Sequence, residues 1–315
     1  MFDAEKFIRE EVETLKDEIK GQAVIACSGG VDSTVAAVLV SRAIGDNLIG
    51  VHVDTGFLRK GEAAGVGKML TEMGVKHVII DASEEFFSAL KGTIEPEAKR
   101  MIIGERFIRV FEREAKKTGA KFLVQGTIAP DWIESGGGLR DVIKSHHNVG
   151  ALPKDMELTL VEPLRDLYKD EVRKVGKALG IAIYDKQPFP GPGLAVRILG
   201  EPTPEAAGIV REACAIVEEE FEGAARAGKM ELPWQYFAVL LPVRTVGVQG
   251  DVRAYGCTIV VRAVQSLDGM TAAYSKIPHE VLERISIRIT NTMKDKVNRV
   301  VYDITNKPPG TIEWE

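Results

Sequence analysis

The hydrophobic residues at the start of the chain form two different patterns, a helical period and then a short continuous run. Over residues 3–20 they fall four, three and four positions apart, which predicts an amphipathic helix with Ile8, Val12, Leu15 and Ile19 on one face. The apolar run at 23–27 is short, as is typical of a buried strand. The first half of the chain therefore begins as a helix followed by a strand.

This alternation continues as far as residue 179. Short apolar runs predict strands at 48–53, 75–80, 122–125 and 161–164. Helical patterns follow or separate them at 34–40, 62–73, 83–90, 97–118 and 169–179. Strands that alternate with helices predict a doubly wound α/β fold, a parallel sheet with helices on both faces.

The pattern changes at Gln187–Gly193, which holds three prolines and two glycines in seven residues. Such a segment is a stiff linker. We therefore predict a first domain over 1–187 and a second over 188–315. Strands at 194–199, 235–240, 258–264 and 297–304, with helices at 205–227 and 278–293, predict that the second is a smaller α+β domain.

The most informative stretch is Ser28–Ser33, with the sequence SGGVDS, which we name the SGGVDS loop. It lies between a predicted strand and a predicted helix. Its glycines let backbone N–H groups converge, and the first turn of the helix adds unpaired N–H groups and the positive end of its dipole. The loop therefore predicts a phosphate site. The alternative is an ordinary turn, since Ser, Gly and Asp are common turn residues.

The SGGVDS loop differs from the common phosphate loops. It has neither the lysine of a Walker loop nor the glycine spacing Gly-x-Gly-x-x-Gly. A carboxylate at Asp32 would repel phosphate unless a divalent cation lay between them. The loop therefore indicates a phosphate chain that binds with Mg²⁺, with Asp32 as the metal ligand.

Two other segments follow predicted strands, Asp54–Gly56 and Gly126–Thr127. Ligands of parallel α/β sheets bind beyond the carboxyl ends of the strands, so we expect both segments near the SGGVDS loop.

Residues 128–157 have no clear period and contain a glycine triplet. They predict either a mobile lid or a surface loop without a role. The lid is favoured by the polar residues gathered there, Asp131, Glu134, Lys144, His146 and His147. The adjacent histidines predict a packed or hydrogen-bonded pair, because neighbours in sequence rarely point at one ion.

Composition excludes several classes of protein. The 315 residues carry a net charge of −5, which argues against a broad nucleic-acid surface. No apolar run approaches the ~20 residues that span a membrane, and the charged N-terminus is no secretory signal. Three widely spaced cysteines form no Cys-x-x-Cys, which indicates neither zinc nor a disulfide framework and favours a cytoplasmic setting.

Eight longer stretches resemble one family. They are SGGVDST (28–34), PEAKRMIIGERF (96–107), QGTIAPDWIES (125–135), IKSHHNVGALPK (143–154), VEPLRDLYKDEVRKVG (161–176), PFPGPGLAVR (188–197), LPVRTVGVQGD (241–251) and KPPGTIEWE (307–315). Over nearly its whole length the chain resembles the ATP-pyrophosphatase part of the GMP synthetases. The last three stretches resemble the dimerisation domain of that family.

The resemblance implies a ligase that makes GMP from XMP, ATP and ammonia, with Mg²⁺. The C2 oxygen of XMP attacks the α-phosphate of ATP to give adenylyl-XMP and pyrophosphate, and ammonia then displaces AMP.

By position in the family, the resemblance implies three sets of site residues. ATP and pyrophosphate would be held by Ser28, Gly29, Gly30, Val31, Asp32, Ser33, Val53, Gly126 and Thr127. The catalytic set would be Asp32, Asp131, Glu134 and Lys144. XMP would be held by Arg197, Gln249, Lys307, Thr311, Ile312 and Glu313.

The resemblance also implies partners. We expect a homodimer through the second domain. No cysteine nucleophile with a partner histidine precedes residue 28, so a separate glutaminase subunit would supply the ammonia. No nucleic acid or membrane is expected.

Three alternatives remain at this point. A tRNA-thiolating pyrophosphatase would need a reactive cysteine and a basic surface. A non-catalytic scaffold would lack ATP binding. An NAD⁺ synthetase would share the SGGVDS loop but not the C-terminal tail, residues 306–315.

Overall fold

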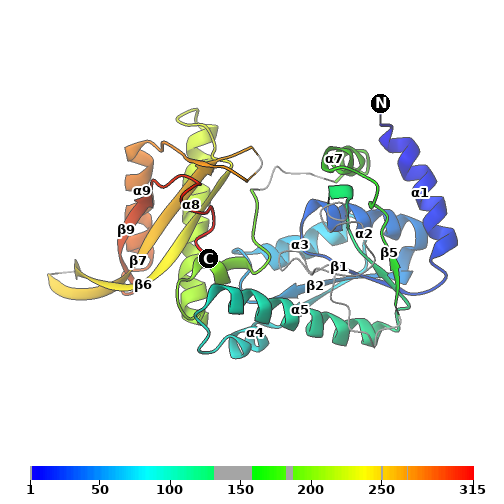
Figure 1. Cartoon of the computed structure of the whole chain (residues 1–315), viewed down its shortest axis with the longest axis horizontal. Coiled ribbons are helices and arrows are strands. Elements are labelled where there is room, and N and C mark those ends of the chain that lie inside the picture. The colour runs from blue at the N-terminus through cyan, green and yellow to red at the C-terminus, as the bar shows by residue number, and fades with distance from the viewer. Residues whose placement is uncertain (1, 131–157, 182–186, 250, 268) are drawn as a thin grey trace. The chain divides into compact units, whose positions relative to one another are not determined.

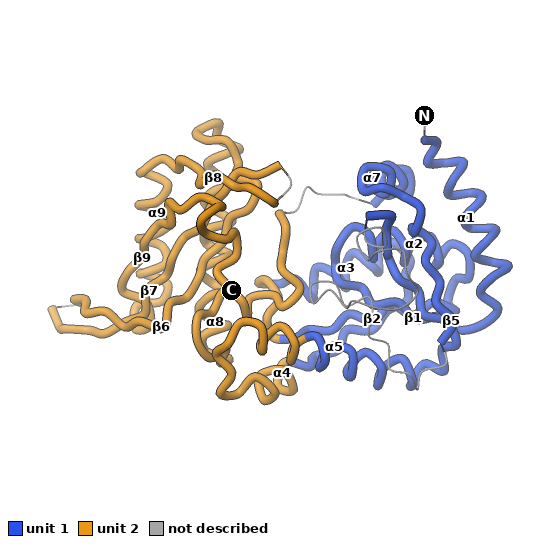
Figure 2. The backbone as a smooth tube through the Cα atoms, viewed as in Figure 1, with its two compact units in different colours: residues 1–55, 61–82, 104–185 blue, residues 56–60, 83–103, 186–315 orange. Residues whose placement is uncertain are grey.

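The computed structural model describes residues 2–130, 158–181, 187–249, 251–267 and 269–315. The chain divides into two compact units (Figure 2). Unit 1 comprises residues 1–55, 61–82 and 104–185, and unit 2 comprises residues 56–60, 83–103 and 186–315. Two short segments of the first half thus group with the second half, and the domain limits predicted at 187 and 188 stay a prediction.

Unit 1 is built on a five-stranded parallel sheet of β1 (Ala23–Ala26), β2 (Leu48–Asp54), β3 (His77–Asp81), β4 (Phe122–Val124) and β5 (Thr159–Val161). Its strand order is β3-β2-β1-β4-β5. The chain builds outward from β1 to β3 and then returns to the other side of β1. The order therefore reverses between β1 and β4, the point where such sheets bind ligands.

Helices cover both faces of this sheet (Figure 1). On one face, α1 (Ala4–Glu18), α2 (Val31–Ile44), α3 (Glu62–Glu72) and α7 (Lys169–Ala178) share a hydrophobic core with the sheet. On the other face lies α5 (Pro96–Thr118), which belongs to unit 1 from residue 104 onward. The predicted doubly wound α/β fold is confirmed.

Unit 2 contains a four-stranded sheet of β6 (Gln235–Gln249), β7 (Val252–Gln265), β8 (Ala273–Tyr274) and β9 (Val297–Asp303). β6 and β7 form a long antiparallel hairpin, and β9 pairs with β7 in parallel. The helices α8 (Pro204–Arg226) and α9 (His279–Thr292) pack beside this sheet, and α4 (Ser83–Ala89) also belongs to unit 2. The predicted α+β architecture is confirmed.

Three predicted elements of unit 2 differ from the structure. The predicted strand 194–199 is wrong, because Gly193–Arg197 forms a 3₁₀ helix, η2. Leu194 through Arg197 are all buried, so the segment has no polar face to reveal its period. The two strands of the hairpin are longer than predicted, because β6 continues past Pro242 through a bulge between Leu241 and Arg244.

The predicted lid and its polar residues Asp131, Glu134, Lys144, His146 and His147 lie outside the described residues. Within the described ranges, no helix is long and apolar enough to cross a membrane.

Candidate nucleotide site

The SGGVDS loop joins β1 to α2 at the point where the strand order reverses. α2 begins at Val31, and Gly30 precedes it with extended backbone, φ −77° and ψ 161°. No side chain caps this helix end. Because the first amides of a helix have no partners within the helix itself, such a helix end suits an anionic ligand.

Two hydroxyls converge at the mouth of the SGGVDS loop. Ser28 Oγ and Ser33 Oγ lie 3.1 Å apart. Ser28 Oγ also accepts from the Gly30 amide at 3.3 Å, and Ser33 Oγ donates to the Gly30 carbonyl at 3.2 Å. Ser28 and Gly30 are exposed while the strand behind them is buried. The loop thus presents polar groups to solvent from a rigid apolar base.

Two glycines are required by close approach. Gly29 has φ +81°, and a Cβ there would lie 2.7 Å from a methyl of Val66. A Cβ at Gly126 would lie 2.9 Å from backbone atoms of Asp32 and Ser33. The segment after β4 therefore packs directly against the first turn of α2. The structure brings the predicted residue Gly126 to the SGGVDS loop.

Two buried polar atoms follow β4. Thr127 is 6% exposed, and its Oγ1 has no hydrogen-bond partner among the described residues. Gln125 Oε1 is likewise buried and has no hydrogen-bond partner among the described residues, and the sequence pattern does not single it out. A buried polar group without a partner is costly, so a ligand that supplies hydrogen bonds here would be stabilised.

At the end of β2, Val53 is buried, so only its backbone is suited to a polar ligand. Its neighbour His52 is 2% exposed, and its Nδ1 lies 2.6 Å from the carbonyl oxygen of Cys27. The sequence alone does not reveal this contact, because it joins residues of two strands. The available signal was a histidine among the β-branched residues of a strand that ends at the site.

Cys27 comes directly before the SGGVDS loop and is itself buried. Burial raises the pKa of its thiol to about 12. The thiolate is the reactive form of cysteine, so this residue is unsuited to carry sulfur at neutral pH. The geometry therefore disfavours a tRNA-thiolating enzyme that uses Cys27.

Asp32 is the acidic residue in the first turn of α2. Within the described residues, no group of three or more His, Cys, Asp or Glu could hold a metal ion. Mg²⁺ bound with nucleotides is usually held by one or two carboxylates together with phosphate oxygens and water. A single carboxylate beside a phosphate-binding turn fits this form of Mg²⁺ binding.

In unit 2, two of the predicted XMP residues bind each other. Arg197 is fully buried and holds Glu313 through two hydrogen bonds of 3.0 and 2.7 Å. Gln235 Nε2 donates to the same carboxylate at 2.7 Å, and the guanidinium stacks 4.0 Å over the ring of Phe237. Burial alone would lower the pKa of Arg197, but the Glu313 carboxylate outweighs it and the pKa is raised.

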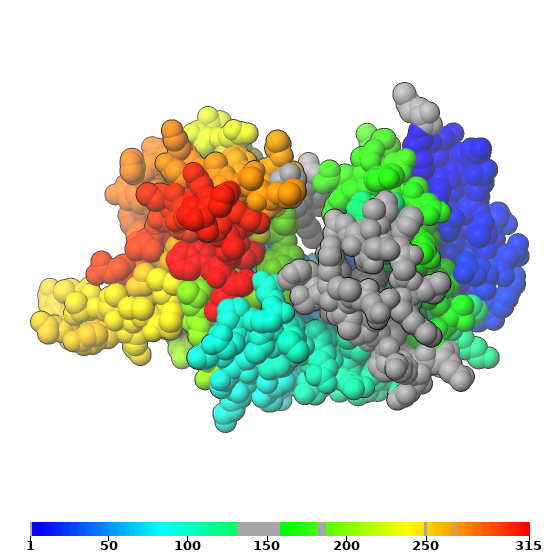
Figure 3. Space-filling view, viewed as in Figure 1, coloured from blue at the N-terminus to red at the C-terminus, as the bar shows by residue number. Residues whose placement is uncertain are grey.

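The C-terminal residues, red in Figure 3, gather on one face of unit 2. Arg262, fully buried, donates to the carbonyls of Thr305 and Thr311 at 2.5 and 3.0 Å and pairs with Asp303 at 3.2 Å. Lys307 Nζ donates to the Gly269 carbonyl at 2.8 Å. These contacts order the segment that contains four predicted XMP residues, Lys307, Thr311, Ile312 and Glu313.

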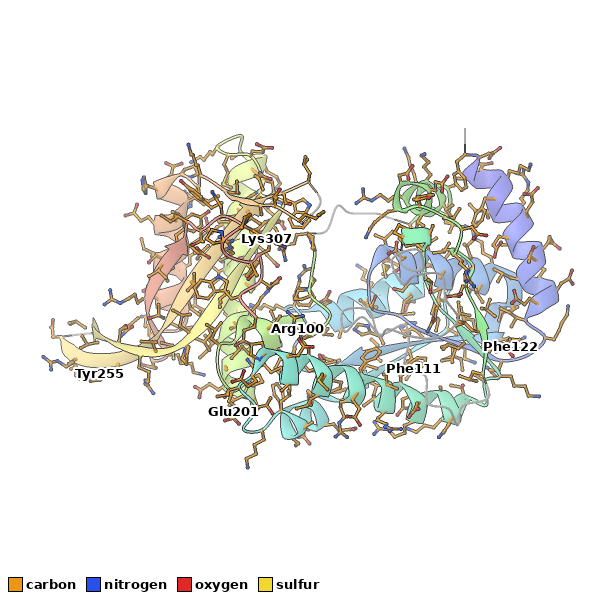
Figure 4. All side chains as sticks on the ribbon, viewed as in Figure 1. Arg100, Phe111, Phe122, Glu201, Tyr255 and Lys307 are labelled. Carbon is orange, nitrogen blue, oxygen red and sulfur yellow. The ribbon has the colours of Figure 1, made fainter. Side chains whose placement is uncertain are left out.

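Gln249 is not brought to the other predicted XMP residues. Gln235 contacts Glu313 at the start of β6, whereas Gln249 ends the strand. The 15 residues of β6 span roughly 45 Å at ~3.3 Å per residue. In Figure 4, Tyr255 on the hairpin lies far from Lys307 in the tail. One mononucleotide cannot reach both ends within a single chain.

Two family models match the chain. The model described as NAD synthase matches residues 1–112, and the model described as GMP synthase C terminal domain matches residues 222–314. The first match covers the SGGVDS loop and the second covers the hairpin and most of the tail.

Full-length relatives are also similar. A protein of Thermococcus kodakarensis, named as one subunit of a glutamine-hydrolyzing GMP synthase, is 60% identical over 99% of both chains. The protein of the same name from Methanopyrus kandleri is 57% identical over the whole of both chains. The glutamine-hydrolyzing GMP synthase of Caldicellulosiruptor saccharolyticus, which is not named as a subunit, is 56% identical over 98% of this chain and 61% of its own.

Proposed function

The chain belongs to this family of glutamine-hydrolyzing GMP synthase subunits, and on that premise we propose that it makes GMP from XMP, ATP and ammonia. ATP is the co-substrate, and the enzyme is a ligase that forms a C–N bond.

The observation that carries this proposal is the SGGVDS loop at the reversal of the strand order. Its helix amides lack a capping side chain, its two hydroxyls converge, and Gly126 closes against its backbone. These groups suit the β- and γ-phosphates of ATP. The orphaned polar atoms of Gln125 and Thr127 suit the polar edges of the adenosine.

In the proposed first step, the C2 oxygen of XMP forms a bond to the α-phosphorus of ATP and the bond to the β-phosphate oxygen breaks. Negative charge then grows on the departing pyrophosphate. The fixed amides of α2 and the hydroxyls of Ser28 and Ser33 stabilise this charge without having to reorient. In the second step, ammonia adds at C2 and AMP leaves with the C2 oxygen.

Asp32 is the residue that would hold Mg²⁺ at this site. When bound, Mg²⁺ would neutralise phosphate charge next to this carboxylate. Asp131, Glu134 and Lys144 remain predicted catalytic residues by family position.

XMP is proposed to bind to unit 2 through Lys307, Thr311, Ile312 and Glu313, with Arg197 holding Glu313 in place. Because Gln249 is roughly 45 Å along β6 from this group, we propose that it acts in the XMP site of a second copy of the chain. This arrangement would need the predicted homodimer.

A separate glutamine amidotransferase subunit is proposed to supply ammonia. Relatives of the same length are named as one subunit of the glutamine-hydrolyzing enzyme, which supports a partner subunit.

The proposal is tested with the chain, MgATP, XMP and an ammonium salt, with GMP and pyrophosphate as the measured products. Asp32→Ala should lower XMP-dependent pyrophosphate release by at least a hundredfold, since it removes charge balance in the transition state. Asp46→Ala, a change outside the SGGVDS loop within η1 (Gly45–Asn47), is the control. Formation of no GMP by the wild-type chain would refute the proposal.

A further inference from the structure

A buried histidine lies behind the SGGVDS loop. His52 stands on β2, the strand next to β1, and is 2% exposed. Its Nδ1 lies 2.6 Å from the carbonyl oxygen of Cys27, the residue that precedes the loop. A carbonyl oxygen can only accept, so Nδ1 carries the proton in this contact.

This contact fixes the direction of one peptide unit. Cys27 N–H donates to the Val51 carbonyl at 2.9 Å, so the backbone of Cys27 faces β2. Its carbonyl oxygen points to the same side, where His52 holds it. In a planar trans peptide, the C=O of one residue and the N–H of the next point in opposite directions. The N–H of Ser28 therefore points away from β2.

The side opposite β2 is the side of β4, because β1 lies between these two strands. That is the crevice at the reversal of the strand order, where ligands of such sheets bind. Ser28 Oγ and the Gly126 segment also lie at the SGGVDS loop. The Ser28 amide is thus oriented toward the place where a phosphate would lie.

We propose that His52 is a positioning residue for the SGGVDS loop. His52 holds the Cys27 carbonyl, and this orients the Ser28 amide to donate to a phosphate oxygen of ATP and of the departing pyrophosphate. This inference rests on the proposed function, because it assigns the loop to pyrophosphate. It goes beyond that function by adding a residue outside the loop that touches no ligand.

The other ring nitrogen suggests the variant that tests the idea. His52 Nε2 is buried and has no hydrogen-bond partner among the described residues. Asparagine carries its Nδ2 donor at about the place of the histidine Nδ1 and has no group in place of Nε2. His52→Asn should therefore keep the useful donor and remove the orphaned atom, whereas His52→Leu fills similar space and keeps no donor.

A matched control lies on the neighbouring strand. His77 on β3 makes the same kind of contact, from Nδ1 to the Val75 carbonyl at 3.0 Å. Its carbonyl partner does not precede the SGGVDS loop. His77→Leu should change the stability of the sheet without changing phosphate binding.

The experiment titrates the full chain with Mg-pyrophosphate, MgATP and AMP by calorimetry. His52→Leu should weaken pyrophosphate and ATP binding about tenfold or more, the loss of one charge-assisted hydrogen bond, and leave AMP binding unchanged. His52→Asn should stay within about threefold of the wild type. In ¹⁵N spectra, the Ser28 amide should shift on pyrophosphate binding in the wild type and His52→Asn but far less in His52→Leu.

The outcomes separate the two proposals. Wild-type affinity for pyrophosphate in His52→Leu, or equal losses in His52→Leu and His52→Asn, would overturn the role of His52 and leave the proposed function intact. A wild-type chain that binds neither pyrophosphate nor ATP would overturn both. If His52→Leu does not fold, His52→Gln replaces it, because its longer side chain carries the donor past the Cys27 oxygen.

Discussion

Glu11 on α1 has an unusual carboxyl group. Burial, together with the nearby carboxylates of Glu18 and Asp166, raises its pKa to about 7. The folded protein therefore binds a proton at Glu11 more tightly than the unfolded chain, in which the pKa of this carboxyl is near 4.5. Protonation of Glu11 stabilises the fold in full below pH 4.5, and this contribution is lost as the pH rises through about 7.

Glu11→Gln should therefore stabilise unit 1 at pH 8 and change little at pH 4.5. Glu11 is partly exposed, so after allowance for solvent screening we expect a gain on the order of 1 kcal/mol at pH 8. The measurement is urea unfolding at the two pH values. Glu10→Gln, which alters an exposed pair with Lys6, is the control. An equal gain at both pH values would contradict a raised carboxyl pKa as the cause.

Gly126 makes a second prediction at this scale. A Cβ added there would meet backbone of Asp32 and Ser33 at 2.9 Å, and backbone cannot move aside as a side chain can. Gly126→Ala should shift the SGGVDS loop at a cost of about 1–3 kcal/mol, which lowers the affinity for ATP tenfold or more.

The control for Gly126→Ala is Gly65→Ala on α3, where a Cβ would meet nothing within 4 Å. An alanine within a helix stabilises by about 0.5–1 kcal/mol, so Gly65→Ala should leave ATP binding intact. Calorimetric titration of both variants with MgATP decides the matter, and equal affinities would show that the close approach of Gly126 has no effect on the site.

At the residue scale, the sequence identifies the SGGVDS loop because a phosphate-binding turn is a local motif. It does not identify Gln125 or His52, because their roles depend on neighbours from other strands. His52 lies 25 residues from the carbonyl it contacts. Only the pairing of β1 with β2 brings the two together.

At the scale of elements, the tail is ordered by side chains that belong to the sheet of unit 2. Arg262 on β7 contacts Thr305 and Thr311, on both sides of the Pro308–Pro309 pair. A planar guanidinium can serve several acceptors at once, whereas an ammonium is a single point charge. One side chain thus holds the tail on both sides of its two adjacent prolines.

Arg262→Lys should therefore loosen the tail, at a cost of about 2–3 kcal/mol for the lost hydrogen bonds to a charged donor. We expect the KM for XMP to rise at least tenfold while the affinity for pyrophosphate stays unchanged. Hydrogen exchange of residues 305–311 should quicken in the same variant. Arg226→Lys, in an exposed pair with Glu222, should change neither quantity.

Elements were predicted well where their period was visible and poorly where it was not. The helix α1 has one apolar face, whereas α2 is buried at every position from Thr34 to Val40. The sequence indicates α2 and the central strands by their lengths and by the turns around them. The segment η2 is buried on every side, so its sequence reads as a strand. The predicted hairpin strands are shorter than the real ones, because Pro242, Gly247 and Gly256 weaken a strand pattern.

At the scale of the whole molecule, the long hairpin bears on how an XMP site is completed. Its exposed apolar residues are Val243, Val246, Val248, Val252 and Tyr255. Gln249 ends β6, at the opposite end of the strand from Gln235, which contacts Glu313 in the tail. Sequence could nominate Gln249 by resemblance, but only the length of β6 shows that it cannot share a ligand with Glu313 of the same copy.

We therefore expect the variants Gln249→Ala and Lys307→Ala to complement each other. In a mixed dimer, one of the two XMP sites would combine an intact tail from one copy with an intact Gln249 from the other. The variants are co-expressed with different tags, and the mixed dimer is purified before assay. With one intact site of two, GMP synthesis should recover to about half of the wild-type rate.

Lys307→Ala mixed with Glu313→Ala is the matched control. Both residues belong to the same tail, so each site of a mixed dimer lacks one of them and no activity should return. Recovery in the first mixture alone would place Gln249 in the XMP site of the partner copy. If Gln249 acted in the site of its own copy, each site of that mixed dimer would carry one of the two changes and neither site would be complete. If both mixtures were equally inactive, Gln249 would not act in the partner's site. It could not contact XMP in its own copy either, because the length of β6 separates it from the tail of that copy.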